Sequence, residues 1–139
     1  MTDVVQKLWG FCHYLRHDGM NYGNYIEQLT YLLFLKMAFE KDLKLPKGCN
    51  WDELLIFSGS DLLEKYIKIL LTLGKEKGIL GDIFGSSLSA FNNPSNLKKL
   101  LDLIDKEDWT SLDVDIKAKA YEGLLEKYAA DEKGAGQYF

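Results

Sequence analysis

Two histidines stand four residues apart near the start of the chain, at a spacing that can bind zinc. His13 and His17 lie in a segment of helical periodicity, where positions i and i+4 share a face. The zincin pattern H-E-x-x-H requires a glutamate directly after the first histidine, and Tyr14 stands there instead. The chain has no third histidine, Cys12 lies on another face, and a structural zinc takes four ligands. The sequence therefore predicts no metal site, only the polar end of a helix beside a loop.

Two further short motifs have the composition of binding or catalytic loops. The glycine-rich segment GILGDIFG, residues 78–85, follows a helical pattern, whereas a phosphate-binding loop follows a strand and opens a helix. We interpret its apolar residues as anchors on the core. The segment NNPSN, residues 92–96, is similar in part to the N-P-P-[YF] motif of enzymes that methylate amino groups of bases, but Ser95 replaces the second proline and Asn96 the aromatic residue. An Asn-Pro turn explains it better. No catalytic residue is predicted.

The elements that carry these residues are predicted to be helices throughout. Apolar residues recur at three- and four-residue spacing, and no segment alternates with period two. The second helix is apolar nearly all round, which is typical of a buried central helix, and Pro46 and Gly48 are expected to end it. We predict an all-α fold, a compact bundle of about five to seven helices without a significant sheet. The predicted N-caps are Asp3, Asn24, Asn50, Ser60, Ser95, and Asp113 or Asp115.

Three local features complete this prediction. Gly19 and Gly23 are expected to bracket a loop, and Gly78 to end the helix that starts at Ser60. Residues 79–96, rich in Gly, Ser and Asn, are predicted to be a long irregular connection. The inner face of the helix from Ser60 is predicted to carry Leu63, Tyr66, Ile67, Leu70 and Leu71.

Charge and composition narrow the class of protein. The 139 residues suggest one domain, and their net charge of −4 weighs against an autonomous nucleic-acid-binding domain. Arg16 is the only arginine, so any DNA contact is expected to reach phosphates rather than read bases. Cys12 and Cys49 form no C-x-x-C pair, and with no basic signal sequence at the start they favour the reducing cytoplasm. The longest apolar run, residues 31–35, is too short to span a membrane.

Two groups of motifs together carry a family resemblance. The first is Leu8-Trp9, LRHDGM at residues 15–20, Tyr25, and LTYLLFLK at residues 29–36. The second is a helix from Tyr121 to Ala129 that leads into GQYF at residues 136–139. In this order they resemble the N-terminal helical domain of the methylation (M) subunit of type I restriction-modification systems, and the junction that follows it. Gly123 departs from the bulkier residue that relatives often carry.

The resemblance implies how the chain is divided. Residues 1–133 are expected to form the helical N-terminal domain, and residues 134–139 a hinge and the first residues of an S-adenosylmethionine-dependent methyltransferase domain. Gln137, Tyr138 and Phe139 are then expected to begin the cofactor-binding segment. The parent protein is expected to be a site-specific, adenine-N6 DNA methyltransferase. The chain by itself has neither the glycine-rich cofactor loop nor N-P-P-[YF], so it is expected not to bind S-adenosylmethionine and to be inactive.

The resemblance also implies partners. The domain is expected to help close the complex around double-stranded DNA and to contact the specificity subunit, with the restriction subunit of the same system as a further candidate. Arg16 and His17, before the first loop, and Lys36 and Lys41, in a cluster with Lys44 and Lys47, are predicted to contact DNA. The alternative is a helical module that binds only protein, which the net acidity favours. Contacts with phosphate would weaken steeply with salt, whereas apolar docking would not.

Overall fold

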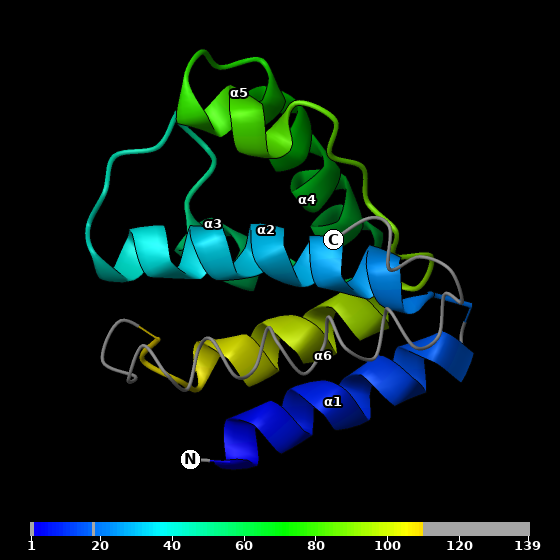
Figure 1. Cartoon of the computed structure of the whole chain (residues 1–139). Helices are drawn as coiled ribbons and strands as arrows, with labels where there is room; N and C mark the ends of the chain where they lie inside the picture. The colour runs from blue at the N-terminus through cyan, green and yellow to red at the C-terminus, as the bar shows by residue number, and fades with distance from the viewer. Residues whose placement is uncertain (1, 18, 110–139) are drawn as a thin grey trace, which may run out of the picture. The chain divides into compact units, whose positions relative to one another are not determined.

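The computed structural model describes residues 2–17 and 19–109, and within them the chain forms six α-helices and no strand (Figure 1). The predicted all-α fold is confirmed. The last predicted helix, from Asp113 or Asp115, lies outside the described residues. In chain order the helices are α1 (Thr2–His17), α2 (Tyr22–Glu40), α3 (Trp51–Leu55), α4 (Gly59–Gly74), α5 (Ile79–Phe84) and α6 (Pro94–Asp105).

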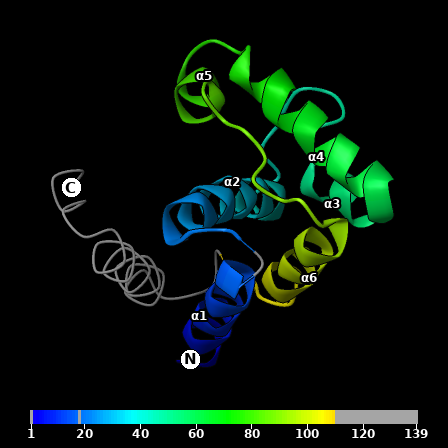
Figure 2. The ribbon, with the colours of Figure 1, turned by 90° about the vertical axis from the view of Figure 1, so that its right-hand side faces the viewer.

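The described residues divide into two compact units. One contains α1 and the start of α2 up to Leu29, and the other runs from Thr30 through the rest of α2 to the end of the described chain. In the second unit, α4 packs against α3, α5 and α6 (Figure 2). Its core is made of fully buried apolar side chains from all of these helices, among them Leu32, Trp51, Leu62, Tyr66, Phe84 and Leu97.

The end of α1 is a hydrogen-bonded cap built on glycine. The Met20 N–H donates to the Leu15 carbonyl at 3.0 Å, and the Gly19 N–H to the Arg16 carbonyl at 3.1 Å. This is the Schellman pattern, which needs a left-handed residue, and Gly19 has a φ of 99°. Glycine adopts that conformation without a steric penalty. The predicted break at Gly19 is therefore explained by its backbone.

The start of α2 differs from the prediction. The helix begins at Tyr22, so Gly23 lies inside it rather than in a loop. The Asn21 side chain accepts a hydrogen bond from the Asn24 N–H at 2.8 Å, which makes Asn21 the N-cap. The prediction of Asn24 as the cap was wrong because two asparagines stand three residues apart, and the earlier one satisfies the backbone of the later one.

The end of α2 also comes earlier than predicted. The helix ends at Glu40, well before Pro46. Asp42 adopts a left-handed conformation with φ 56°, and the Leu43 N–H donates to the Ala38 carbonyl at 2.9 Å. Aspartate is one of the few residues besides glycine that tolerates this conformation. A second Schellman cap therefore ends α2 without a glycine or a proline, which is why the sequence pattern missed it.

The cap and the buried face of α4 are both shifted from the prediction. Ser58, not Ser60, is the N-cap, and the helix ends at Gly74 rather than at Gly78. Ile67 and Leu71 are exposed, because the apolar residues of this helix extend over more than one face and the neighbouring helices cover only one. The residues buried are Leu62, Tyr66, Ile69, Leu70 and Leu73.

The segment predicted to be irregular contains α5. Phe84, at its end, is buried and its ring lies 5.4 Å from that of Tyr31 and 5.6 Å from that of Phe34. The helix begins after Gly78, which has a φ of 79°, and Gly85 is its C-cap. The expectation that this segment is anchored to the core is confirmed for Phe84. The prediction of an irregular connection was wrong for residues 79–84, which form α5, and is confirmed for residues 85–93, which lie outside any helix.

The last described helix, α6, has the predicted inner face but a different cap. Leu97, Leu100, Leu101 and Ile104 are all fully buried. The N-cap is Asn93, whose side chain accepts a hydrogen bond from the Ser95 N–H at 3.0 Å. Ser95 had been predicted, but Pro94 is suited to the first helical position, and that places the cap at the residue before it.

Candidate functional site

The first group of predicted DNA-contacting residues lies in the last turn of α1. Arg16 is exposed and His17 is the final helical residue. Beneath this turn Leu15 and Tyr25 are buried, and the Tyr25 ring meets that of Phe11 edge-on at 6.5 Å. Because the C-terminal end of a helix carries partial negative charge, a phosphate bound here would depend on the guanidinium of Arg16 rather than on backbone N–H groups.

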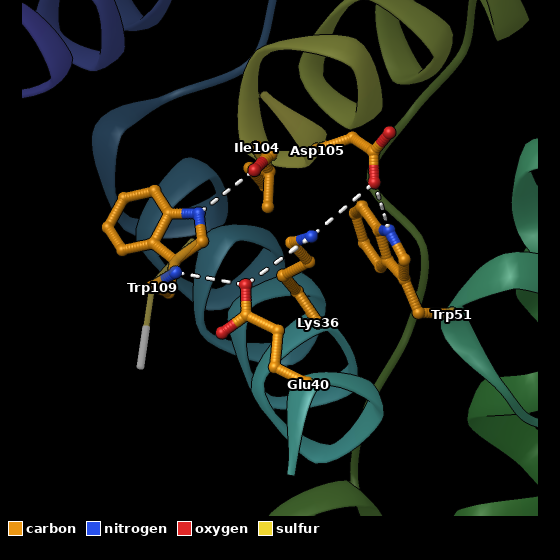
Figure 3. Close-up of polar contacts among 6 residues, drawn as sticks. All are labelled: Lys36, Glu40, Trp51, Ile104, Asp105 and Trp109. Carbon is orange, nitrogen blue, oxygen red and sulfur yellow. Dashed lines mark hydrogen bonds and ion pairs between the residues drawn. The ribbon is translucent and has the colours of Figure 1, made fainter. Parts of the chain in front are cut away.

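The second group lies on α2 and just after it, and its two lysines differ in burial. Lys36 is buried, and its ammonium lies 3.3 Å from the Glu40 carboxylate and 3.5 Å from that of Asp105 in α6 (Figure 3). The side chains of Lys36 and Glu40 are each only 9% exposed, so this ion pair belongs to the interior. The sequence had predicted Lys36 as a DNA contact, but its charge is held by two carboxylates of the same chain. We therefore leave it out of the proposed DNA surface.

Two tryptophans complete the cluster around Lys36. The Trp51 indole N–H donates to Asp105 at 2.9 Å, and the Trp109 backbone N–H donates to Glu40 at 2.9 Å (Figure 3). The Trp109 indole donates in turn to the Ile104 carbonyl at 3.0 Å, near the end of α6. Each carboxylate thus accepts from the lysine and from a tryptophan. This cluster, which we call the Lys36 cluster, joins α2, α3, α6 and the chain after α6.

Sequence reasoning missed the Lys36 cluster as a structural element. Glu40 stands four residues after Lys36, which is the spacing of a helical ion pair, and this was the one local signal available. Asp105 and Trp109 come from much later in the chain, and no spacing rule connects them to α2.

Lys41, the fourth predicted residue, is exposed. It lies directly after α2, and the nearby Lys44 and Lys47 are exposed as well. Between and beside them two large apolar side chains are also open to solvent, with Phe39 45% and Leu43 54% exposed. The end of α2 therefore presents lysines and apolar groups together.

Residues 78–85 follow the helix α4 and most of them form α5, whereas a phosphate-binding loop follows a strand. Across residues 2–17 and 19–109, no three His, Cys, Asp or Glu side chains are grouped as metal ligands would be. Within the same residues, no helix is long and apolar enough to cross a membrane. Gln137, Tyr138 and Phe139 lie outside the described residues.

Comparison with known proteins connects this fold to one family. The HsdM N-terminal domain model matches residues 4–44. The methylase subunits of the type I restriction enzymes StySJI, from Salmonella typhimurium, and EcoKI, from Escherichia coli, are each 38% identical over 99% of this chain. The crystal structure of the EcoKI M protein matches 80% of the chain with a TM-score of 0.69 and 34% identity.

The match covers nearly all of this chain but only part of those relatives. The chain spans 28% of the length of the two methylase subunits and 24% of the EcoKI M protein chain in the crystal structure. The resemblance to methylation subunits that the sequence motifs predicted is confirmed.

Proposed function

We propose that this chain, which matches the N-terminal helical domain of type I methylation subunits, helps a DNA methyltransferase close around its substrate and contacts the specificity subunit. The observation that carries the proposal is the similarity to methylase subunits along 99% of the chain. The parent protein would transfer a methyl group from S-adenosylmethionine to adenine N6, in the cytoplasm, with the restriction subunit as a further partner. The chemistry would lie outside residues 1–133, and Gln137, Tyr138 and Phe139 would begin the cofactor-binding segment.

The proposed DNA contact is the end of α1. Arg16 is exposed on a helix end that the Gly19 cap holds in place, and His17 follows it. A single arginine is suited to contact a DNA phosphate. Such a contact positions the protein on the duplex but does not distinguish one base sequence from another. Lys41 is exposed, so its ammonium can meet either a DNA phosphate or a carboxylate of a partner protein.

The test of the DNA contact belongs in the reconstituted methyltransferase. Arg16→Ala should weaken binding to all duplexes alike and reduce the slope of log affinity against log salt by about one. Lys7→Ala is the matched control, because Lys7 is an exposed cation on the same helix, more than two turns away. A variant that lost preference for the recognition site while keeping its salt slope would show that Arg16 reads bases, and the proposal would be wrong.

The cofactor proposal has its own test. Calorimetric titration of this chain with S-adenosylmethionine should give no binding heat, because its sequence contains neither the glycine-rich cofactor loop nor the N-P-P-[YF] motif. Binding in the micromolar range would place a cofactor site within the chain and overturn the proposed division.

A module that binds only protein remains the second candidate function. The observation that favours it is that Phe39, in the last turn of α2, and Leu43, among the lysines after the helix, are both exposed. Apolar side chains add nothing to the affinity for DNA phosphates, which is electrostatic. If Arg16→Ala and Lys7→Ala bound DNA equally well at every salt concentration, this second candidate would be preferred.

A further inference from the structure

The end of α2 carries a surface of mixed chemistry that the proposed DNA contact does not use. We call it the α2-end surface, and it consists of Phe39, Lys41, Leu43, Lys44 and Lys47. All three lysines are exposed, and both apolar side chains keep about half of their area in solvent. Exposed apolar side chains are ordinary on a soluble domain, and Ile67 and Leu71 of α4 are exposed as well. The α2-end pair is distinguished by the three exposed lysines that lie among and beside it in residues 41–47.

The backbone beneath the first half of this surface, from Phe39 to Leu43, is hydrogen-bonded. The Schellman cap fixes the turn, with the Asp42 N–H donating to the Phe39 carbonyl at 3.1 Å. Glu40, between the two exposed residues Phe39 and Lys41, is tied inward by Lys36 at 3.3 Å and by the Trp109 N–H at 2.9 Å. A surface whose backbone is already ordered loses less entropy when it binds a partner.

The charges of the surface indicate the chemistry of that partner. Between residues 39 and 47 there are three exposed lysines against one exposed aspartate, because the remaining carboxylate, Glu40, faces Lys36. The surface is therefore locally positive on a chain of net charge −4. It complements a group of carboxylates, and its lysines carry no bidentate fork that would read bases.

The two apolar residues favour a protein over DNA as the binding partner of this surface. Aromatic and apolar side chains at the centre with charged groups at the rim are the ordinary anatomy of a protein interface. A phosphate backbone would leave Phe39 and Leu43 in water and gain nothing from them, whereas an apolar patch on a protein would bury both.

We propose that the α2-end surface docks on an acidic, apolar surface of another protein subunit. Phe39 and Leu43 would bury apolar side chains of that subunit, and Lys41, Lys44 and Lys47 would pair with carboxylates around them. This inference rests on the proposed contact with the specificity subunit, and it assigns that contact a place and a chemistry. It gives Lys41 a protein carboxylate as its partner in place of a phosphate.

The experiment compares two double variants of the full chain. The purified specificity subunit is titrated with wild-type chain, with Phe39→Ser/Leu43→Ser, and with the control Ile67→Ser/Leu71→Ser. The control removes a second pair of exposed apolar side chains, also four residues apart but on α4. Removal of the α2-end pair should weaken binding roughly tenfold or more, and the control pair should leave it unchanged. Circular dichroism checks that both variants keep their helices.

Each outcome has a definite meaning. Equal binding by both double variants would overturn the inference while leaving the subunit contact in place. No binding by the wild-type chain would count against the proposed subunit contact as well. A duplex DNA titration completes the test: if Lys41→Ala and Lys44→Ala weaken DNA binding while Phe39→Ser/Leu43→Ser changes neither titration, the surface binds phosphate and the inference is wrong.

Discussion

Replacing Lys36 with methionine is the most direct test of how the second unit is held together. Methionine keeps the length and the apolar stem of the lysine but removes its charge. The Glu40 carboxylate, whose side chain is only 9% exposed, would then keep the Trp109 N–H but lose its cation. Breaking a buried ion pair by removing one partner costs about 3–5 kcal/mol, because the remaining charge is left without compensation.

The size of the effect within that range follows from the two carboxylates. The Asp105 side chain is 42% exposed, so water can compensate for the loss of Lys36 there. Glu40 has no such access, but its bond from Trp109 remains. We therefore expect Lys36→Met to lower the free energy of unfolding by about 3 kcal/mol, at the lower end of the range. Urea unfolding followed by circular dichroism would measure it, provided that the transition is two-state.

Two further variants make the interpretation specific. Lys41→Met, an exposed lysine after the same helix, should change stability by no more than about 0.5 kcal/mol. Glu40→Gln added to Lys36→Met should recover part of the loss, because the neutral amide still accepts from Trp109 and leaves no buried charge. A loss below about 1 kcal/mol for Lys36→Met would be typical of a surface ion pair and would refute the buried cluster. A double variant less stable than Lys36→Met would refute the account of Glu40.

Three other perturbations test separate parts of the fold. Leu32→Ala should lower the free energy of unfolding by about 2–5 kcal/mol, because Leu32 is fully buried, whereas Leu71→Ala at an exposed position should cost little. Urea unfolding measures both variants, and equal losses would show that the burial of Leu32 is wrong. Gly74→Ala should cost about 1–3 kcal/mol, because its Cβ would lie 2.7 Å from the Phe84 carbonyl oxygen, and a thermal midpoint equal to wild type would contradict that contact. Burial raises the pKa of the Cys49 thiol above its ordinary 9.0, so the unfolded thiol ionises first as pH rises. The free energy of unfolding should therefore fall with pH above about 9 more steeply in wild type than in Cys49→Ala, and parallel slopes would show that this thiol does not contribute.

The helices were predictable from sequence because their apolar residues repeat at the helical period. The inner face of α6 follows its pattern residue by residue, and Leu97 and Ile104 are fully buried as expected. In α4 the same pattern does not identify the buried face. Its apolar residues cover more than one face, and only the packing of α3, α5 and α6 decides that Tyr66 is buried and Leu71 is exposed.

The helix ends were harder to predict because several residues could cap each of them. Asn21 and Asn24, Ser58 and Ser60, and Asn93 and Ser95 are competing pairs, and in each pair the earlier residue is the cap. Only the last pair carried a local signal, because Pro94 suits the first helical position and places the cap at Asn93. A left-handed aspartate such as Asp42, by contrast, gives no sequence signal comparable to glycine.

The candidate site illustrates a more general limit, since a lysine in a sequence does not reveal where its charge is satisfied. Lys36 and Lys41 stand five residues apart, and from composition alone both belong to one basic cluster. Their positions on the helix differ, however, because Lys36 follows Leu29, Leu32 and Leu33 at intervals of seven, four and three, which is the register of the buried face. A lysine in that register, with a glutamate four residues later, is better interpreted as half of an internal ion pair than as a DNA contact. The other half of the explanation, Asp105, comes from α6, and only the folded chain places it beside α2. Lys36 pairs with Glu40, which lies between Phe39 and Lys41, so the residue predicted to contact DNA is engaged within the chain beside the surface on which Phe39 and Lys41 are exposed.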